Sequence, residues 1–151
     1  MEIERKYLPK YLPENLEQYK SKKIAQGYLC TNPVVRIRRS NDDYYLTYKG
    51  GGMMAREEYN LPLTKDAYDH LLPKIDGLLI EKTRYLIPLE DGYTAELDIF
   101  EGALEPLTLV EVEFESIEAA NSYTPPEWFG EDVTNSPNYH NSYLSQHTKT
   151  N

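Results

Sequence analysis

Charged and apolar side chains alternate along the first seven residues, and the same alternation returns at intervals down the chain. Glu2, Glu4 and Lys6 occupy every second position, with Ile3 and Tyr7 between them. Successive side chains of a β-strand point to opposite faces, so this pattern predicts a strand with one charged and one apolar face. Similar or β-rich segments predict further strands at 26–30, 34–39, 44–49, 55–63, 79–87, 93–100 and 107–114.

Helical segments are fewer and shorter. The segment 64–77 begins at a capping residue, Thr64, and we expect Gly77 to end it, with Pro73 breaking or kinking its second half. Residues 116–123 and a turn near 139–145 are also predicted to be helical, whereas 14–20 forms a short helix at best. About eight strands with two or three helices predict an α+β fold, either a closed antiparallel barrel or a sandwich. We expect one domain over residues 1–145 and a disordered tail at 146–151.

Composition and charge narrow the class of protein. The chain has 151 residues, of which 40% are hydrophobic and 27% charged, as is ordinary for a globular domain. It lacks a long apolar run and carries charge from residue 2, so we expect neither a membrane segment nor secretion. Cys30 is the only cysteine, which suits the reducing cytoplasm. A net charge of −9 argues against nucleic-acid binding, but not against a small anionic ligand held by a local basic cluster.

The charged faces of the predicted strands are sorted by sign. The acidic pairs are Glu2/Glu4, Glu96/Asp98 and Glu111/Glu113, and the basic pairs are Arg36/Arg38 and Lys82/Arg84. A barrel exterior would also alternate, but there mixed signs are expected for solubility. Carboxylates suit Mg²⁺ or Mn²⁺, and basic groups suit phosphate oxygens, so the sorting is consistent with a metal-bound polyphosphate inside a polar barrel. By the sorting alone, this interpretation and a charged exterior are about equally supported.

Other catalytic chemistries find little support. His70, His140 and His147 are scattered, with no zinc-binding spacing. The glycine run at 50–52 lacks the Lys-Ser/Thr of a P-loop and is interpreted as a hairpin turn. The sequence also has no Gly-x-Ser-x-Gly motif of a serine hydrolase.

Taken in order, the charged segments resemble the CYTH superfamily, the triphosphate tunnel metalloenzymes. The resemblance begins at Glu2-x-Glu4-x-Lys6 and covers roughly residues 2–144. The further motifs are Gln26-Gly27-Tyr28-Leu29, Arg36-Ile37-Arg38, Tyr48-Lys49-Gly50, Arg56-x-Glu58-Tyr59, Lys82-x-Arg84, Glu96-Leu97-Asp98-Ile99-Phe100-x-Gly102, Glu111-Val112-Glu113, 128–134 and Tyr139-His140-Asn141-Ser142. Asn60 and Asp132 depart from the pattern, since family members often carry Glu at these positions.

The resemblance implies an eight-stranded closed antiparallel β-barrel with a few flanking helices, whose interior is a tunnel open at both ends. A linear triphosphate would lie inside, held by basic residues and bridged to acidic residues by Mg²⁺ or Mn²⁺. The implied metal ligands are Glu2, Glu4 and Glu113, with Glu58, Glu96, Asp98 and Glu111 as additional ligands or water-orienting groups. The implied phosphate contacts are Lys6, Arg36, Arg38, Lys49, Arg56, Lys82 and Arg84. Lys6 and Tyr28 would together help to activate water.

The function implied by the resemblance is that of a metal-dependent triphosphatase. Inorganic tripolyphosphate is the preferred candidate substrate, because the chain is barely larger than the barrel and shows no added domain that could read a base. The alternatives are a class IV-type adenylate cyclase and a non-catalytic binder of polyphosphate or nucleotide. If the charges face the tunnel, apolar residues such as Ile37, Leu97 and Val112 face outward and need cover from the helices, the tail or a second copy of the chain in a homodimer.

Overall fold

The alternating segments of the sequence are strands in the computed structural model, which describes residues 1–146. The strands are β1 (Glu2–Pro9), β2 (Lys20–Thr31), β3 (Val34–Ser40), β4 (Asp43–Lys49), β5 (Ala55–Arg56), β6 (Glu58–Leu63), β7 (Asp76–Pro88), β8 (Thr94–Glu101), β9 (Thr108–Glu113) and β10 (Phe129–Asp132). Apart from Gln146, the predicted tail at 146–151 lies outside the described residues, and so does His147.

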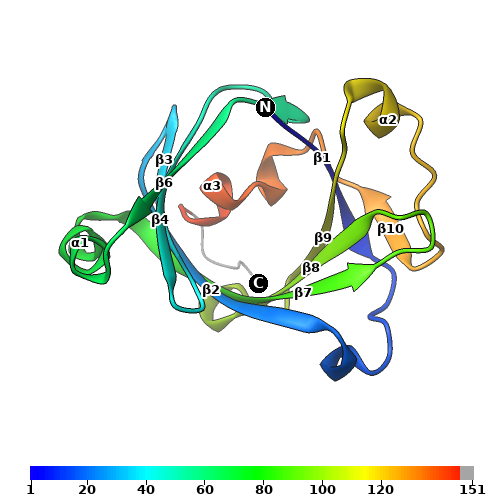
Figure 1. Cartoon of the computed structure of the whole chain (residues 1–151), viewed down its shortest axis with the longest axis horizontal. Coiled ribbons are helices and arrows are strands. Elements are labelled where there is room, and N and C mark those ends of the chain that lie inside the picture. The colour runs from blue at the N-terminus through cyan, green and yellow to red at the C-terminus, as the bar shows by residue number, and fades with distance from the viewer. Residues whose placement is uncertain (147–151) are drawn as a thin grey trace.

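The strands close into a ring around an open centre (Figure 1). Every pairing is antiparallel, in the order β1-β9-β8-β7-β2-β3-β4-β6, and β5 completes the ring by pairing with the start of β1. Because β5 and β6 are separated only by Glu57, they act as one interrupted strand. Counted in this way, the ring has the eight strands that the sequence predicted. The remaining strand, β10, pairs with the far end of β1.

The register of the strands decides which side chains share a face. Arg84 of β7 lies opposite both Lys22 of β2 and Asp98 of β8. Glu111 of β9 lies opposite both Lys6 of β1 and Glu96 of β8. Residues directly opposite each other in an antiparallel pair point to the same side, so the charged faces join around the barrel.

One apolar core lies on the outer side of the ring. Leu97, Val112 and Phe114 pack there with Ala120 of α2 (Ile117–Asn121) and Phe129 of β10. The 3-10 turn η1 (Leu16–Gln18) also packs against this core through Leu16. These elements are the cover that outward-facing apolar strands require.

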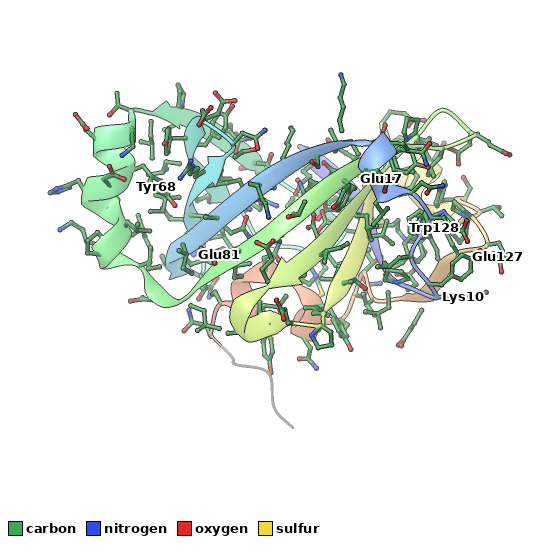
Figure 2. The ribbon with its side chains drawn as sticks, turned by 90° about the horizontal axis from the view of Figure 1, so that it is seen from below. Lys10, Glu17, Tyr68, Glu81, Glu127 and Trp128 are labelled. Carbon is green, nitrogen blue, oxygen red and sulfur yellow. The ribbon has the colours of Figure 1, made fainter. Side chains whose placement is uncertain are left out.

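A second cover lies over β3 and β4. It consists of α1 (Lys65–Leu71), whose Tyr68 packs against Tyr44 with ring centroids 5.1 Å apart, beside the fully buried Ile37. Figure 2 shows the two covers far apart, with Tyr68 on one side of the barrel and Trp128 on the other. The outer face of β4 and β6 keeps Tyr48, Tyr59 and Leu61 exposed. The homodimer, which the sequence analysis gave as one possible cover for such a face, stays a prediction.

The other apolar core fills one end of the barrel interior. Ile80, Phe100 and Leu109 pack there with Tyr28 and with Leu144 of α3 (Asn141–Leu144). Together with η4 (Pro137–Tyr139), α3 lies within the ring in Figure 1. The tunnel is therefore not open along its whole length, because the C-terminal segment lies across one end.

Several predicted boundaries were wrong. The helix that begins at Thr64 ends at Leu71, a 3-10 turn η2 (Leu72–Lys74) carries Pro73, and β7 has already begun before Gly77. The strand predicted to begin at residue 26 begins at Lys20, because β7 pairs with residues 20–25 and β3 joins from Ile24. The short strand β10 and the 3-10 turn η3 (Gly102–Leu104) were not predicted. In the described part of the chain, no helix is both long enough and apolar enough to cross a membrane.

Candidate active site

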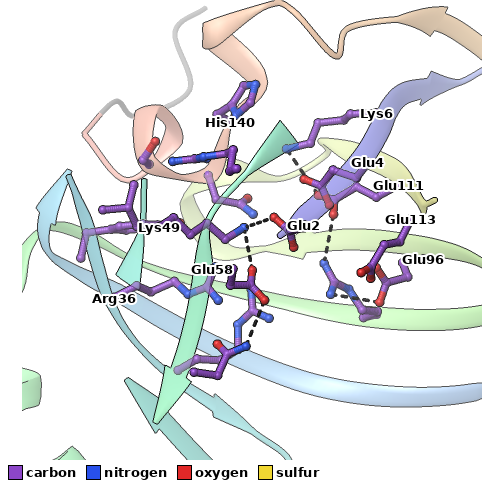
Figure 3. A pocket seen from close by; sticks show the side chains of 18 residues that line it. Glu2, Glu4, Lys6, Arg36, Lys49, Glu58, Glu96, Glu111, Glu113 and His140 are labelled. Carbon is purple, nitrogen blue, oxygen red and sulfur yellow. Dashed lines mark hydrogen bonds and ion pairs between the residues drawn. The ribbon is translucent and has the colours of Figure 1, made fainter. Parts of the chain in front are cut away.

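The charged faces of the strands enclose a cavity inside the barrel (Figure 3). Six carboxylates and six basic side chains line it: Glu2, Glu4, Glu58, Glu96, Glu111 and Glu113, with Lys6, Arg36, Arg38, Lys49, Arg56 and Arg84. The structure therefore decides between the two interpretations of the sorted charges in favour of a polar interior.

One wall of the cavity is acidic, and β1, β8 and β9 build it. Glu4 is paired across strands with Glu113, and Glu96 with Glu111, so four carboxylates lie on adjacent strands. Burial and the neighbouring Glu111 and Glu2 carboxylates raise the pKa of Glu4 well above its usual value. Burial also raises the pKa of Glu113, with Glu2 and Glu58 adding to the shift. A cation placed among these groups would relieve the repulsion that raises both values.

The opposite wall is basic, and β3, β4 and β5 build it. Among residues 1–146, no carboxylate lies within 4.0 Å of Arg36, Arg38 or Arg56. Arg36 is 4% exposed, donates to Thr47 Oγ1 at 3.3 Å, and has a buried Nε without a hydrogen-bond partner. Burial, with Arg36 and Arg84 nearby, lowers the pKa of Arg38 to about 9. This wall has positive charge and hydrogen-bond donors to offer an anion.

Two lysines of the cavity are held in ion pairs, Lys49 between the two walls and Lys6 within the acidic wall. Lys49 Nζ lies 2.8 Å from Glu2 Oε1 and 3.3 Å from Glu58 Oε2. Burial raises the pKa of Glu58, but the hydrogen bond with Glu2 and the Lys49 charge outweigh it and lower that pKa to about 2. Lys6 Nζ lies 3.3 Å from Glu111 Oε1. Burial opposes the charged form of Lys6, but Glu111 and Glu4 outweigh it and raise its pKa, so Lys6 is an ammonium.

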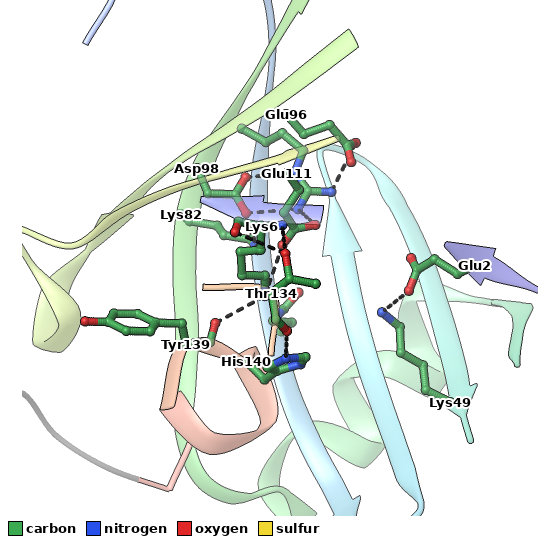
Figure 4. A network of polar contacts seen from close by, with 12 residues as sticks. Glu2, Lys6, Lys49, Lys82, Glu96, Asp98, Glu111, Thr134, Tyr139 and His140 are labelled. Carbon is green, nitrogen blue, oxygen red and sulfur yellow. Dashed lines mark hydrogen bonds and ion pairs between the residues drawn. The ribbon is translucent and has the colours of Figure 1, made fainter. Parts of the chain in front are cut away.

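Behind the acidic wall lies a buried cluster of Lys82, Arg84 and Asp98 (Figure 4). Arg84 Nε and Nη2 donate to the two Asp98 oxygens at 2.8 and 2.9 Å, while Arg84 Nη1 donates to Glu96 at 3.3 Å. Lys82 Nζ is fully buried 2.6 Å from Asp98 Oδ2. Burial lowers the pKa of Lys82 to about 7. The Asp98 carboxylate acts to raise this pKa, but the Arg84 and Arg38 charges lower it further.

The structure brings together almost all of the residues that the sequence nominated. Tyr28 lines the cavity with the six acids and six bases, whereas Lys82 and Asp98 lie beneath its surface. The implied phosphate contact of Lys82 therefore has no direct access to the cavity in this structure. Lys82 contacts Asp98, which in turn fixes the guanidinium of Arg84.

The C-terminal segment contributes lining residues to which the sequence analysis gave no role. His140, Asn141 and Ser142 reach the cavity, and Lys6 Nζ donates to the carbonyl oxygen of Tyr139 at 3.1 Å (Figure 4). His140 Nε2 lies 3.1 Å from Thr134 O, and burial together with the Lys6 charge lowers its pKa. The motif 139–142 signalled these residues, but the pattern alone gave no reason to place them inside a barrel. Val34 and Asn60 also line the cavity.

The donor chemistry of the acidic wall suits a hard divalent cation, but the carboxylates are engaged with their neighbours. Among the described residues, no group of three or more His, Cys, Asp or Glu is arranged so that it could hold a metal ion. Glu2 is held by Lys49, and a hydrogen bond joins Glu4 to Glu111. Oxygen donors of the kind that Mg²⁺ and Mn²⁺ prefer are therefore present, with Glu2 Oε1 already in contact with Lys49.

Comparison with known proteins agrees with this geometry. A sequence model of the CYTH domain matches residues 1–142. The chain belongs to the CYTH family. An inorganic triphosphatase of Nitrosomonas europaea is 41% identical over 147 residues, which are 95% of this CYTH chain and 96% of the relative. An inorganic triphosphatase of Acetivibrio thermocellus is 37% identical over 124 residues, 79% of this chain and 77% of the relative.

The fold of this CYTH protein also matches a solved structure. The crystal structure of the inorganic triphosphatase NE1496 aligns with a TM-score of 0.75 and 38% sequence identity, covering 99% of this chain and 97% of that one. The family membership that the ordered motifs predicted is confirmed, and so is the antiparallel barrel.

Proposed function

We propose that this CYTH protein is a metal-dependent inorganic triphosphatase that hydrolyses a phosphoanhydride bond of tripolyphosphate. The observation that carries the proposal is the division of one cavity into a carboxylate wall and a wall whose arginines have no carboxylate partner in the described part of the chain. Phosphoryl transfer needs positioning and charge stabilisation more than covalent chemistry, and these two walls offer both. The names of the relatives support the choice of inorganic triphosphate.

The basic wall would bind the phosphates. Arg36 and Arg38 each present a guanidinium that matches two phosphate oxygens, while Lys49 and Arg56 add charge from the next strands. Arg84 and Lys6 would approach from the acidic side, and Lys82 would act through Asp98 to hold Arg84 in place. Phosphate would also supply the acceptor that the buried Arg36 Nε does not have among the residues that the structure describes.

The acidic wall would hold Mg²⁺ or Mn²⁺ through Glu2, Glu4 and Glu113. When bound, such a cation neutralises phosphate charge and lowers the pKa of a bound water. Around it, Glu58 and Glu111 would fix the lysines that face the substrate, as they do in this structure. These assignments require no change in the strand register that brings the five carboxylates to the cavity.

Water activation would involve Lys6, Tyr28 and Glu96. The raised pKa of Lys6 favours a role as a donor that orients the water or a phosphate oxygen. Tyr28 OH accepts from Gln26 Nε2 at 3.5 Å and would orient the water from the other side. Burial raises the pKa of Glu96 in spite of Arg84, which makes this carboxylate a better proton acceptor than an ordinary glutamate. The water oxygen would form the new bond to phosphorus as the anhydride bond breaks, and its proton would pass to Glu96.

Phosphate release from tripolyphosphate, ATP and thiamine triphosphate, each with Mg²⁺, with Mn²⁺ and with EDTA, tests the proposal. We expect turnover of tripolyphosphate to exceed turnover of the organic triphosphates and to stop in EDTA. Cyclic AMP and diphosphate as the products from ATP would indicate the cyclase. Binding of tripolyphosphate without phosphate release under any of these conditions would indicate a non-catalytic binder.

A further inference from the structure

A second cavity continues the candidate site toward an end of the barrel interior. It shares Arg36, Arg38 and Asn60 with the site, so the two cavities adjoin at these residues. Beyond these shared residues its lining includes Lys22, Asp43 and Tyr45. Among the described C-terminal residues, His140, Asn141 and Ser142 line the site cavity and none lines the second one. A linear substrate held by Arg36 and Arg38 would therefore extend one of its ends into this cavity.

Lys22 is the basic residue that the second cavity adds. It belongs to the inner face of β2, because it lies opposite Arg84 of β7. The other lysines of the site, Lys6 and Lys49, are paired with Glu111 and Glu2. Over residues 1–146, no carboxylate lies within 4.0 Å of the Lys22 ammonium. Its side chain is exposed at the mouth, so it can meet the end of a substrate that reaches it.

We propose that Lys22 binds the terminal phosphate of tripolyphosphate and so favours inorganic over nucleoside triphosphates. This inference rests on the proposed function. Inorganic triphosphate ends in a phosphate at both ends, whereas a nucleoside triphosphate carries a ribose ester at one of them. Lys22 and Arg38 bring two positive charges to the second cavity, against the single carboxylate of Asp43. A terminal phosphate gains from both charges, and an uncharged ribose does not.

The neighbouring Lys23 provides a matched control. It lies on the opposite face of β2, outside the barrel, where its ammonium is 2.8 Å from Glu101 Oε2. The experiment compares Lys22→Ala, Lys22→Arg and Lys23→Ala by kcat/KM for tripolyphosphate and for ATP, with Mg²⁺. We expect Lys22→Ala to lose roughly tenfold on tripolyphosphate, the size of one solvent-exposed charged contact, and less than twofold on ATP. Lys22→Arg should recover most of the loss, and Lys23→Ala should match the wild type.

Equal losses on both substrates, no loss on tripolyphosphate, or a larger loss on ATP would each overturn the assignment of Lys22. The larger loss on ATP would mean that the second cavity binds the nucleoside part of ATP. Calorimetric Kd values for tripolyphosphate with Ca²⁺ separate this inference from the proposed function. If the wild type binds tripolyphosphate but does not hydrolyse it, the proposed function fails, while a weaker Kd in Lys22→Ala than in Lys23→Ala still supports a contact by Lys22. An unchanged Kd in Lys22→Ala refutes that contact.

Discussion

Replacing Arg36 by methionine tests the basic wall where it is most buried. Within residues 1–146 the guanidinium has one hydrogen bond, to Thr47, and its Nε has no partner, so at least two donor positions are available to a phosphate. Hydrogen bonds to charged groups contribute about 1.5–3 kcal/mol each. Loss of two at the lower end of that range amounts to about 3 kcal/mol, or a factor of roughly 10² in kcat/KM. Arg36→Lys should recover only part of it, because a point charge cannot reproduce the fork.

The same substitution should leave the ligand-free protein at least as stable as the wild type. Arg36 is one of the charges that lower the pKa of Arg38 to about 9, so its removal relieves repulsion within the wall. Methionine keeps most of the buried volume. The substitution should therefore separate function from stability, which an ordinary defect in core packing would not do.

Arg39→Met is the matched control, since Arg39 is the next arginine but one on β3, lies on the outer face and is exposed. Phosphate release from tripolyphosphate with Mg²⁺ and the melting temperature without ligand are measured for both variants. A kcat/KM of Arg36→Met within threefold of Arg39→Met would refute the phosphate-binding role of Arg36. A large fall in melting temperature specific to Arg36→Met would show that its role is structural.

Three further substitutions test other parts of the site. Glu4→Gln should reduce turnover of tripolyphosphate by at least about 10², as loss of a charge-stabilising group does, and activity close to that of the wild type would contradict the role of Glu4. Because the pKa of Glu4 is raised in the folded protein, the ionised carboxylate destabilises the wild type at pH 7. The variant should therefore be more stable than the wild type at pH 7, and this difference should vanish near pH 4. Lys82→Met tests how the lowered pKa of Lys82 affects stability. Lys82 keeps its proton up to about pH 10.5 in the unfolded chain but only up to about pH 7 in the folded protein, so the free energy of unfolding of the wild type should rise with pH in this range. Urea unfolding should show the wild type gaining stability relative to the variant between pH 6.5 and 8.5. A pH-independent difference would contradict the buried, depressed Lys82. Leu144→Ala should cost about 2 kcal/mol of unfolding free energy, because Leu144 packs in the interior core, and an unchanged value would show that α3 does not stabilise the barrel.

The sequence predicted the inner face of the barrel because two simple regularities coincide there. Side chains alternate with a period of two along a strand, and the signs of the inward charges are sorted by strand. These regularities put Glu2 with Glu4, and Arg36 with Arg38, on shared faces but supported a charged exterior equally well. The family resemblance favoured the interior and supplied the closed ring. The family could be recognised because its motifs occur in order through most of the chain.

What the sequence did not predict depends on contacts between distant segments. Residues 20–23 read Lys-Ser-Lys-Lys and carry no apolar alternation, yet they are strand because β7 pairs with each of them. Pairing with β2 also starts β7 at Asp76, before the predicted end of the helix. Likewise, alternation puts Lys82 and Arg84 on the same face but cannot show that Arg84 lines the cavity while Lys82 is buried behind it.

The position of β1 in the ring also bears on how the protein folds. Glu4 pairs with Glu113, and Tyr7 pairs with Asp132, so the first strand meets partners more than 100 positions away along the chain. Contacts of such long range are slow to form, because closing a large loop costs conformational entropy before the strand pairing contributes any stabilisation. The hairpins between β2 and β4 need only local contacts. In refolding, the basic wall should thus form before the acidic wall, and a partly folded molecule would carry a cationic sheet capable of holding phosphate before it has a complete place for a cation.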